Sequence, residues 1–456
     1  MDVVAGVVRA LGMDVDPRTG LDVTGGSPVL ASPYRVTPAA TAAVAAATLG
    51  IGELWRLRGG PRARVAVDTR HATLAFRSER YLRVDGETMA IWAELSGDYR
   101  AADGWVRLHA NYPAHRVAIT RAMRVPEDRS KLAAAVSDRA AVAVEDAVIR
   151  AGGAAAALRT PREWQGHEHG TAVAALPLVS MDRLDRSPPR PLPGGDHPLE
   201  NVRVLDLSRV IAGPVAARTL AAYGADVLRV GADHLALVPA LLMDTGFGKR
   251  FCHLDLRTDA GRGVLRELVA GADVVIQAFR PGALDRWGFG PEACAKLRPG
   301  LVYVSISAWG EAGPWGGRRG FDSLVQLATG LGWSAEGPLS LPAQVLDHGT
   351  GWLAAAAAVE GLRRRHTVGG SWHARLSLAR TACWLDSLGR TGASDPAELD
   401  YPTDLVSTMD SAFGRLEYLR PPGGIEGYQP RWTTPPRLPG ADAAAWAVGA
   451  SAVDAR

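Results

Sequence analysis

The chain has 456 residues, of which 47% are hydrophobic and 22% charged, and its formal net charge is +3. This balance is typical of a globular protein of two or three domains. It disfavours a nucleic-acid-binding protein, which more often carries a basic stripe. The three cysteines, Cys252, Cys294 and Cys383, are too far apart in sequence to predict a disulfide framework or a zinc site. We therefore expect a cytoplasmic protein without metal, signal peptide or membrane-spanning helix.

The first half of the chain predicts two structural units. An alanine-rich helix is expected over 38–58, and the pair Gly59-Gly60 separates it from a strand over 64–68. Alternation around a turn at Asp103-Gly104 then predicts a hairpin. The elements expected after the hairpin are helices near 114–122, 127–136 and 140–151, and one that begins at Pro161.

A proline-rich stretch, residues 186–199, predicts a linker. Beyond it short apolar runs alternate with helical patterns, which indicates an α/β fold with a doubly wound, parallel, Rossmann-like sheet. Ligands on such sheets bind at the carboxyl ends of the strands. The strands are expected at 202–208, 226–230, 273–279 and 301–307, and the helices at 214–223, 259–271 and 291–297.

Two stretches of the chain are similar to one another. Residues 40–72 and residues 350–382 each contain an alanine-rich helix, a basic end, a Gly-Gly break and a strand. We interpret them as copies of one helix–strand unit, in which Asp347 of the second copy falls on Thr37 of the first. The predicted organisation is a partial helix–strand repeat (1–96), a small α+β domain (97–185), the linker (186–199), the sheet domain (200–392) and a C-terminal segment returning to the large domain (393–456).

Asp347 is a candidate functional acid, because it lies at the start of the second alanine-rich helix. It allows two interpretations. As a helix cap it would accept hydrogen bonds from free backbone N–H groups. As a nucleophile it would be kept ionised by the helix dipole, with Gly349 and Gly351 leaving the backbone open to a ligand oxyanion.

A dinucleotide site is a poor alternative for this sheet. The first turn, at 208–214, lacks the Gly-x-Gly-x-x-Gly pattern, and the second strand ends in Val230-Gly231-Ala232 without a ribose-binding acid. Arginines in the loops that follow the strands, Arg280 and Arg286 among them, suit phosphates instead.

Several motifs together resemble the class III, or CaiB/BaiF-like, CoA-transferases, whose relatives include formyl-CoA transferase, carnitine CoA-transferase and 2-methylacyl-CoA racemase. The motifs occur in order from about residue 200 to 390. They are LDLSRVIAGP (205–214), YGADVLRV (223–230), GKRFCHLDLRTDAG (248–261), DVVIQAFRPGALDRWGFG (273–290), LVYVSISAWGEAGP (301–314), GFDSLVQLATG (320–330) and VLDHGTG (345–351). In the family the small domain follows this region, whereas here it precedes it, so the arrangement is permuted or fused.

The resemblance implies an activity and a set of site residues. Asp347 matches the catalytic aspartate, which attacks an acyl-CoA and passes its CoA to a carboxylic acid through a covalent aspartyl intermediate. Coenzyme A would be a substrate rather than a tightly bound cofactor, and the protein would be a homodimer. The positions expected at the CoA site are Arg209, Ile211, Ala212, Arg280, Arg286, Arg319, Phe321 and Gly349.

Two other functions remain open on the sequence. The permuted order and the apolar Ile211, where the family has a polar residue, are compatible with a CoA-binding partner subunit that has no activity of its own. A racemase needs a base on each face of the α-carbon. Phe321 occupies the place of the racemase histidine, which favours transfer over racemisation.

Overall fold

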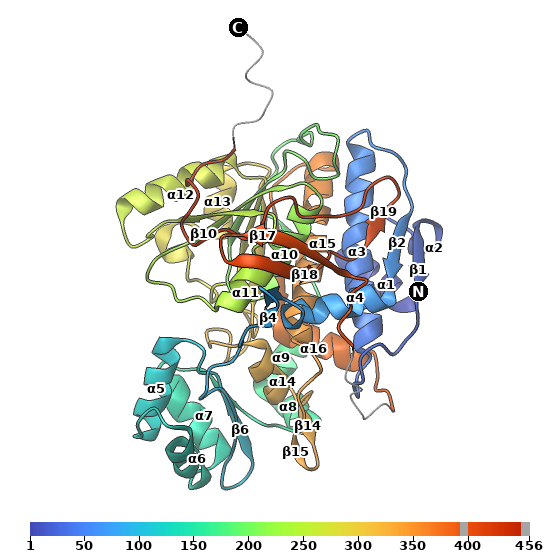
Figure 1. Ribbon diagram of the computed structural model, residues 1–456. Coiled ribbons are helices and arrows are strands. Elements are labelled where there is room, and N and C mark those ends of the chain that lie inside the picture. The colour runs from blue at the N-terminus through green and yellow to red at the C-terminus, as the bar shows by residue number, and fades with distance from the viewer. Residues whose placement is uncertain (393–399, 448–456) are drawn as a thin grey trace.

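The computed structural model describes residues 1–392 and 400–447, and a seven-stranded sheet lies at its centre (Figure 1). The strand order is β11-β10-β9-β12-β13-β16-β8; the first six are parallel and β8 pairs antiparallel with β16. The strands are β9 (Arg203–Leu207), β10 (Asp226–Gly231), β11 (Lys249–His253), β12 (Val274–Gln277), β13 (Val302–Ser307), β16 (Trp372–Ser377) and β8 (Ser180–Arg183). This arrangement confirms the predicted α/β fold.

Helices cover both faces of the sheet, which explains why its central strands are mostly apolar. In β12, Val274 and Ile276 pack in one core and Val275 in the other. The helices of the first core include α10 (Ala212–Ala222) and α15 (Val345–Thr367), and those of the second are α12 (Asp259–Gly271) and α13 (Pro291–Leu297). The strand order reverses between β9 and β12, which is where such sheets bind ligands.

The N-terminal segment belongs to the first of these cores. Helix α3 (Val36–Leu57) packs along α15, and alanines of both helices are fully buried there, which permits a close approach. Both helices begin after a residue of the same backbone conformation, with φ and ψ of −77° and 60° at Arg35 and −78° and 64° at Gln344. Counted from the first helical residue, Asp347 of α15 corresponds to Pro38 of α3.

Short elements surround α3. They are α1 (Asp2–Leu11), α2 (Pro17–Gly20), β1 (Leu21–Thr24), β2 (Val65–Asp68), α4 (Thr69–Leu74), a 3-10 turn η1 (Ala75–Arg80), β3 (Arg83–Val84) and β4 (Glu87–Thr88). Strand β2 joins a separate sheet in the order β1-β2-β19, so the first helix–strand copy does not extend the main sheet.

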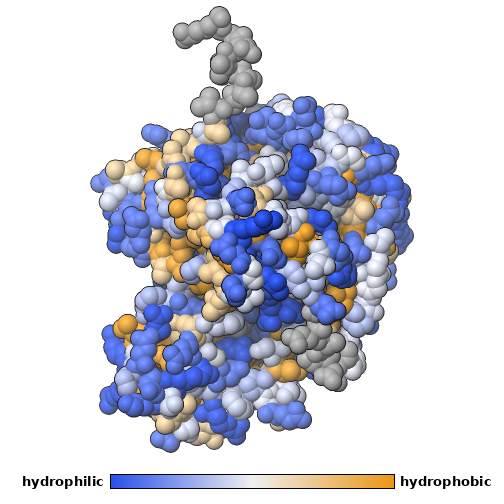
Figure 2. Space-filling view, in the orientation of Figure 1, coloured by the Kyte–Doolittle hydropathy of each residue, from blue (hydrophilic) through white to orange (hydrophobic). Residues whose placement is uncertain are grey.

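The small unit, residues 95–157, has a hydrophobic core of its own. It protrudes at the lower left of Figures 1 and 2. Its predicted hairpin is present, because β5 and β6 pair antiparallel and flank Asp103-Gly104. The elements are β5 (Gly97–Arg100), β6 (Trp105–Leu108), α5 (Pro113–Met123), α6 (Arg129–Ser137), α7 (Ala141–Arg150) and β7 (Ala155–Ala157).

The residues after the small unit pack on the main body. Trp164 in α8 (Pro161–Gly166) and Val173 in α9 (Glu168–Ala174) lie in the main core, and β8 extends the main sheet. We therefore propose that the small domain ends near residue 158, because the apolar contacts of the following residues are with the sheet.

The linker runs close to the turn between α15 and β16. A Cβ atom on Gly369 would lie 2.4 Å from the Ser187 carbonyl oxygen, and the φ of 78° at Gly369 also favours glycine. The Gly-Gly pair therefore does more than end a helix, since it lets the linker cross this turn.

The described part of the C-terminal segment, 400–447, returns to the N-terminal segment and to the sheet, while 393–399 and 448–456 of the predicted segment lie outside the described residues. Strand β18 pairs with β3, and β19 with β2. No helix in the described ranges is long and apolar enough to cross a membrane. The remaining elements are α11 (Pro239–Asp244), η2 (Asp285–Trp287), α14 (Asp322–Ala328), β14 (Trp333–Ser334), β15 (Gly337–Pro338), α16 (Leu378–Ser387), β17 (Val406–Ser411), β18 (Gly414–Leu419) and β19 (Gly424–Ile425).

Candidate functional site

Asp347 lies where the first turns of α15, α14 and α10 meet. It is the third residue of α15 and is 7% exposed. Gly351, one turn later, touches the start of α10, since a Cβ atom there would be 2.6 Å from the Ala212 carbonyl oxygen. Gly351 is thus required for the crossing of two helices and does not open the backbone to a ligand.

The free N–H groups of α15 are capped by Asp322. The backbone N–H groups of Leu346 and Asp347 donate to Asp322 Oδ2 at 2.7 and 2.8 Å, and the side chain of Gln326 donates to the other oxygen. The interpretation of Asp347 as the helix cap is therefore wrong, because another helix supplies the cap. The carboxylate of Asp347 is therefore not used to cap α15.

Burial raises the pKa of Asp347 well above its ordinary value, and the charges of Asp322 and Glu79 raise it further. A hydrogen bond from the Ala212 backbone acts in the opposite direction. Burial likewise raises the pKa of Asp322 to about 6. We expected the helix dipole to keep Asp347 ionised, but desolvation and two neighbouring carboxylates outweigh it.

A narrow cavity of about 20 Å³, with room for about one water molecule, lies beside Asp347. Its walls come from the sheet domain and from the small unit together. The lining residues are Ile91, Trp92, His109, Asn111, Tyr112, Val210, Ile211, Val238, Leu241, Phe321, Asp322, Gln344 and Asp347.

His109 of the small unit stacks on Phe321, with ring centroids 3.6 Å apart and planes 2° apart. The residue is 4% exposed, and its Nδ1 atom has no hydrogen-bond partner among the described residues. Sequence analysis missed His109 and the nearby Tyr112. The stretch HANYPAH (109–115) concentrates histidine and tyrosine after a predicted hairpin, which was the available signal.

Glu79 is another residue that the sequence did not single out. Its Oε2 lies 3.0 Å from His348 Nε2, and both side chains are buried. Phe76, one turn earlier, stacks on His348 at 5.9 Å. The N-terminal segment therefore contacts the first turn of α15 directly.

The predicted CoA-site residues fall into two groups. Ile211, Ala212 and Phe321 lie at or next to the cavity, as their motif positions imply. Gly349 lies elsewhere, since the nearest atoms to a Cβ placed on it belong to Thr381 and Phe76.

The predicted arginines occupy the loops after the strands. The guanidinium of Arg209 lies between the rings of Tyr112 and Phe279, about 6 Å from each. Burial lowers the pKa of Arg319, and the positive charge of Arg280 lowers it as well, which indicates that the two guanidinium groups are close to one another. Arg286 stacks on Trp287 at 4.3 Å. Three of the four thus surround one edge of the sheet, and Arg286 lies on the turn beyond it.

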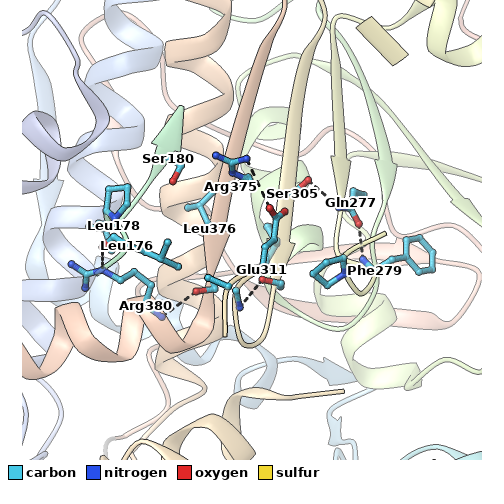
Figure 3. A pocket seen from close by; sticks show the side chains of 17 residues that line it. Leu176, Leu178, Ser180, Gln277, Phe279, Ser305, Glu311, Arg375, Leu376 and Arg380 are labelled. Atoms are coloured by element: carbon cyan, nitrogen blue, oxygen red, sulfur yellow. Dashed lines mark hydrogen bonds and ion pairs between the residues drawn. The ribbon is translucent and has the colours of Figure 1, made fainter. Parts of the chain in front are cut away.

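A wider cavity of about 350 Å³ opens at the carboxyl ends of β12, β13 and β16 (Figure 3). Gln277 donates to Ser305 there, and Glu311, Arg375 and Arg380 are charged groups of its wall. Asp347 is not among its lining residues. We propose that the chemistry takes place at the smaller cavity, because the pKa of Asp347 is raised well above its ordinary value there, although burial also raises the pKa of Glu311 in the wider cavity.

Comparison with known proteins identifies the region that carries this site. Residues 199–388 match CoA-transferase family III. The chain is 33% identical over 265 residues to an acyl-CoA transferase of Gibberella moniliformis, which covers 54% of this chain and 46% of the relative. It is 33% identical over 204 residues to a formyl-CoA:oxalate CoA-transferase of Streptomyces coelicolor, covering 40% of this chain and 50% of the relative.

The comparisons cover only part of each protein. The chain spans about half the length of the curated relatives it matches. The solved structure of a CAIB/BAIF family protein from Brucella suis is 27% identical, with a TM-score of 0.37 and coverage of 48% of this chain and 65% of that chain.

Proposed function

Because residues 199–388 match CoA-transferase family III, we propose that this protein transfers coenzyme A from an acyl-CoA to a carboxylic acid, with Asp347 as the covalent nucleophile. The observation that carries the proposal is a buried carboxylate that does not cap its own helix, has a raised pKa and lines a cavity. Such perturbed acids are found at functional sites more often than elsewhere.

The proposed reaction uses the carboxylate twice. Asp347 attacks the thioester carbonyl of the donor, which breaks the C–S bond and gives a mixed anhydride and the CoA thiolate. The thiolate attacks the aspartyl carbonyl, which releases the donor acid and leaves an aspartyl-CoA thioester. The acceptor carboxylate attacks this thioester, which frees the CoA thiolate and leaves the acceptor bound to Asp347 as an anhydride. The thiolate then attacks the acyl carbonyl of the acceptor, which forms the new acyl-CoA and restores Asp347.

The electrostatics of the site support this route. A raised pKa makes the Asp347 carboxylate a stronger nucleophile once it is ionised, so transfer should rise with pH through that pKa. Arg209, Arg280 and Arg319 provide positive charge for the phosphates of CoA. Because the cavity holds only about one water, it must widen to admit a thioester.

The test compares Asp347→Asn with the unchanged protein on pairs of acyl-CoA and acid, with product formation followed by mass spectrometry. We expect transfer to fall by about a thousandfold or more, since the group that forms the covalent intermediate is lost. Hydroxylamine added during turnover should label Asp347. Asp259→Asn is the control, because the Asp259 side chain is fully exposed at the surface.

Transfer that survives in Asp347→Asn would contradict the assignment. Binding of CoA without turnover by the unchanged protein would favour a partner subunit instead. A homodimer and a cytoplasmic location are further proposals, which native mass spectrometry and cell fractionation address.

A further inference from the structure

We propose that His109 is a further catalytic residue of this site, and that its imidazole N–H donates a hydrogen bond to the oxygen of the thioester carbonyl whose carbon Asp347 attacks. This inference rests on the proposed CoA transfer. No proton is transferred in the step, since the hydrogen bond only stabilises the negative charge that develops on that oxygen.

The small unit holds His109 at the wall of the reaction cavity. The residue follows β6, and its backbone N–H donates to the Ala154 carbonyl at 3.0 Å, which ties it to the strand that precedes β7. It lines the same cavity as Asp347. An acyl group at Asp347 would therefore contact this ring.

The imidazole is also an unusual buried group. It is 4% exposed, and its Nδ1 atom has no hydrogen-bond partner in the part of the chain that the structure describes. Leaving a buried polar atom without a partner costs about 1–3 kcal/mol, and most buried polar atoms in proteins do have one. A ligand in the cavity would satisfy the ring.

The orientation of the ring is determined by three aromatic neighbours. Phe321 lies parallel to it at 3.6 Å, Tyr112 is stacked at 6.1 Å, and His115 meets it edge-on at 5.9 Å. A donor held in this way needs no reorganisation during the reaction, which is the condition for effective stabilisation of an oxyanion.

The charge state of His109 suits a donor and excludes an acid or base. Burial, and to a lesser extent the charge of the neighbouring His115, lowers the pKa of His109 to about 3. The ring is therefore neutral from about pH 5 upwards and carries one N–H. A neutral imidazole in an active site can polarise a carbonyl group in this way.

The loop after β9 does not supply the donor. Ile211 contributes an apolar side chain to the cavity, and the Ala212 backbone N–H is directed at the Asp347 carboxylate. The oxyanion therefore needs a donor from another part of the chain, and the ring of His109 is available.

The first test uses His109→Phe, which keeps the stack on Phe321 but removes the N–H. We expect kcat to fall about 100-fold, the loss typical for one oxyanion donor, with KM changed only a few-fold. His109→Gln, which retains a donor, should recover part of kcat. His197→Phe is the control, because His197 is exposed and does not line the cavity, and it should keep kcat within a few-fold.

The second test needs no turnover. Asp347→Asn is mixed with an acyl-CoA labelled with ¹³C at the thioester carbonyl, and the carbonyl stretch is recorded by difference infrared spectroscopy. We expect a shift to lower wavenumber on binding, and the same experiment in Asp347→Asn with His109→Phe should abolish it.

The outcomes separate the inference from the proposed function. An unshifted carbonyl in bound acyl-CoA, or equal kcat losses in His109→Phe and His197→Phe, would overturn the role of His109 while leaving CoA transfer intact. Failure of Asp347→Asn to bind any acyl-CoA, together with absence of transfer in the unchanged protein, would overturn both.

Discussion

Asp347 illustrates how burial changes the properties of a single acid. Its sequence position at a helix start suggested an ionised carboxylate, yet the side chain is buried between the carboxylates of Asp322 and Glu79. The protein holds this charge at a cost to its stability, as is common for catalytic groups.

Asp347→Asn is therefore expected to stabilise the fold, and increasingly so as pH rises. The pKa of Asp347 in the folded state lies above its unfolded value of about 4. The contribution of protonated Asp347 to the free energy of unfolding is therefore fully present below about pH 4 and is lost as pH rises through the folded-state pKa. Asparagine does not ionise, so the variant avoids this loss. Urea unfolding at pH 5 and pH 8 should show a gain that grows with pH to about 1 kcal/mol or more, since one unit of pKa corresponds to about 1.4 kcal/mol. An equal difference at both pH values would contradict the argument.

At the scale of elements, the site depends on how closely α15 crosses α10. Gly349 and Gly351 of α15 look alike in sequence, but only Gly351 faces α10. A Cβ atom at Gly351 would be 2.6 Å from the Ala212 carbonyl oxygen, whereas at Gly349 the nearest atom is 3.4 Å away.

Gly351→Ala is expected to destabilise the protein by about 1–3 kcal/mol, because the contacted atom is backbone and α10 must shift. The shift should also reduce transfer, since the Ala212 N–H moves away from Asp347. Gly349→Ala is the matched control and should be close to neutral, as an ordinary contact is compensated by the better helix propensity of alanine. Thermal unfolding of both variants checks this, and equal effects would show that the crossing is not tight.

At the scale of the whole molecule, the N-terminal segment packs against the helix that carries Asp347. The pair Glu79–His348 joins η1 to the first turn of α15, and Ser78 donates to Asp244 of α11 at 2.9 Å. Residues separated by more than two hundred positions in sequence therefore support one helix end.

A double-mutant cycle on Glu79→Gln and His348→Asn tests this connection. Each single change is expected to destabilise the fold by about 3 kcal/mol, because it leaves one buried partner unmatched. The double variant should lose less than the sum, with a coupling of about 0.5–3 kcal/mol. Strictly additive losses in urea unfolding would mean that the N-terminal segment does not support α15 through this pair.

Much of the fold could be predicted because its signals are local. Apolar runs separated by turn residues predicted β9, β10, β12 and β13, and alanine-rich stretches predicted α3 and α15. Strands β8 and β11 were missed, because β8 is short and half polar and β11 carries Lys249 and Arg250. Their place in the sheet depends on pairing with distant strands.

The sequence by itself determined the α/β fold, the match of residues 199–388 to CoA-transferase family III and the choice of Asp347 as the candidate nucleophile, since these depend on motifs and periodicity along the chain. Only the tertiary structure decided that Asp322 caps α15, that Glu79 contacts His348 and that His109 lines the cavity. The physical reason is that burial and proximity set the charge and the hydrogen bonds of each group, and both arise from contacts between residues far apart in the sequence.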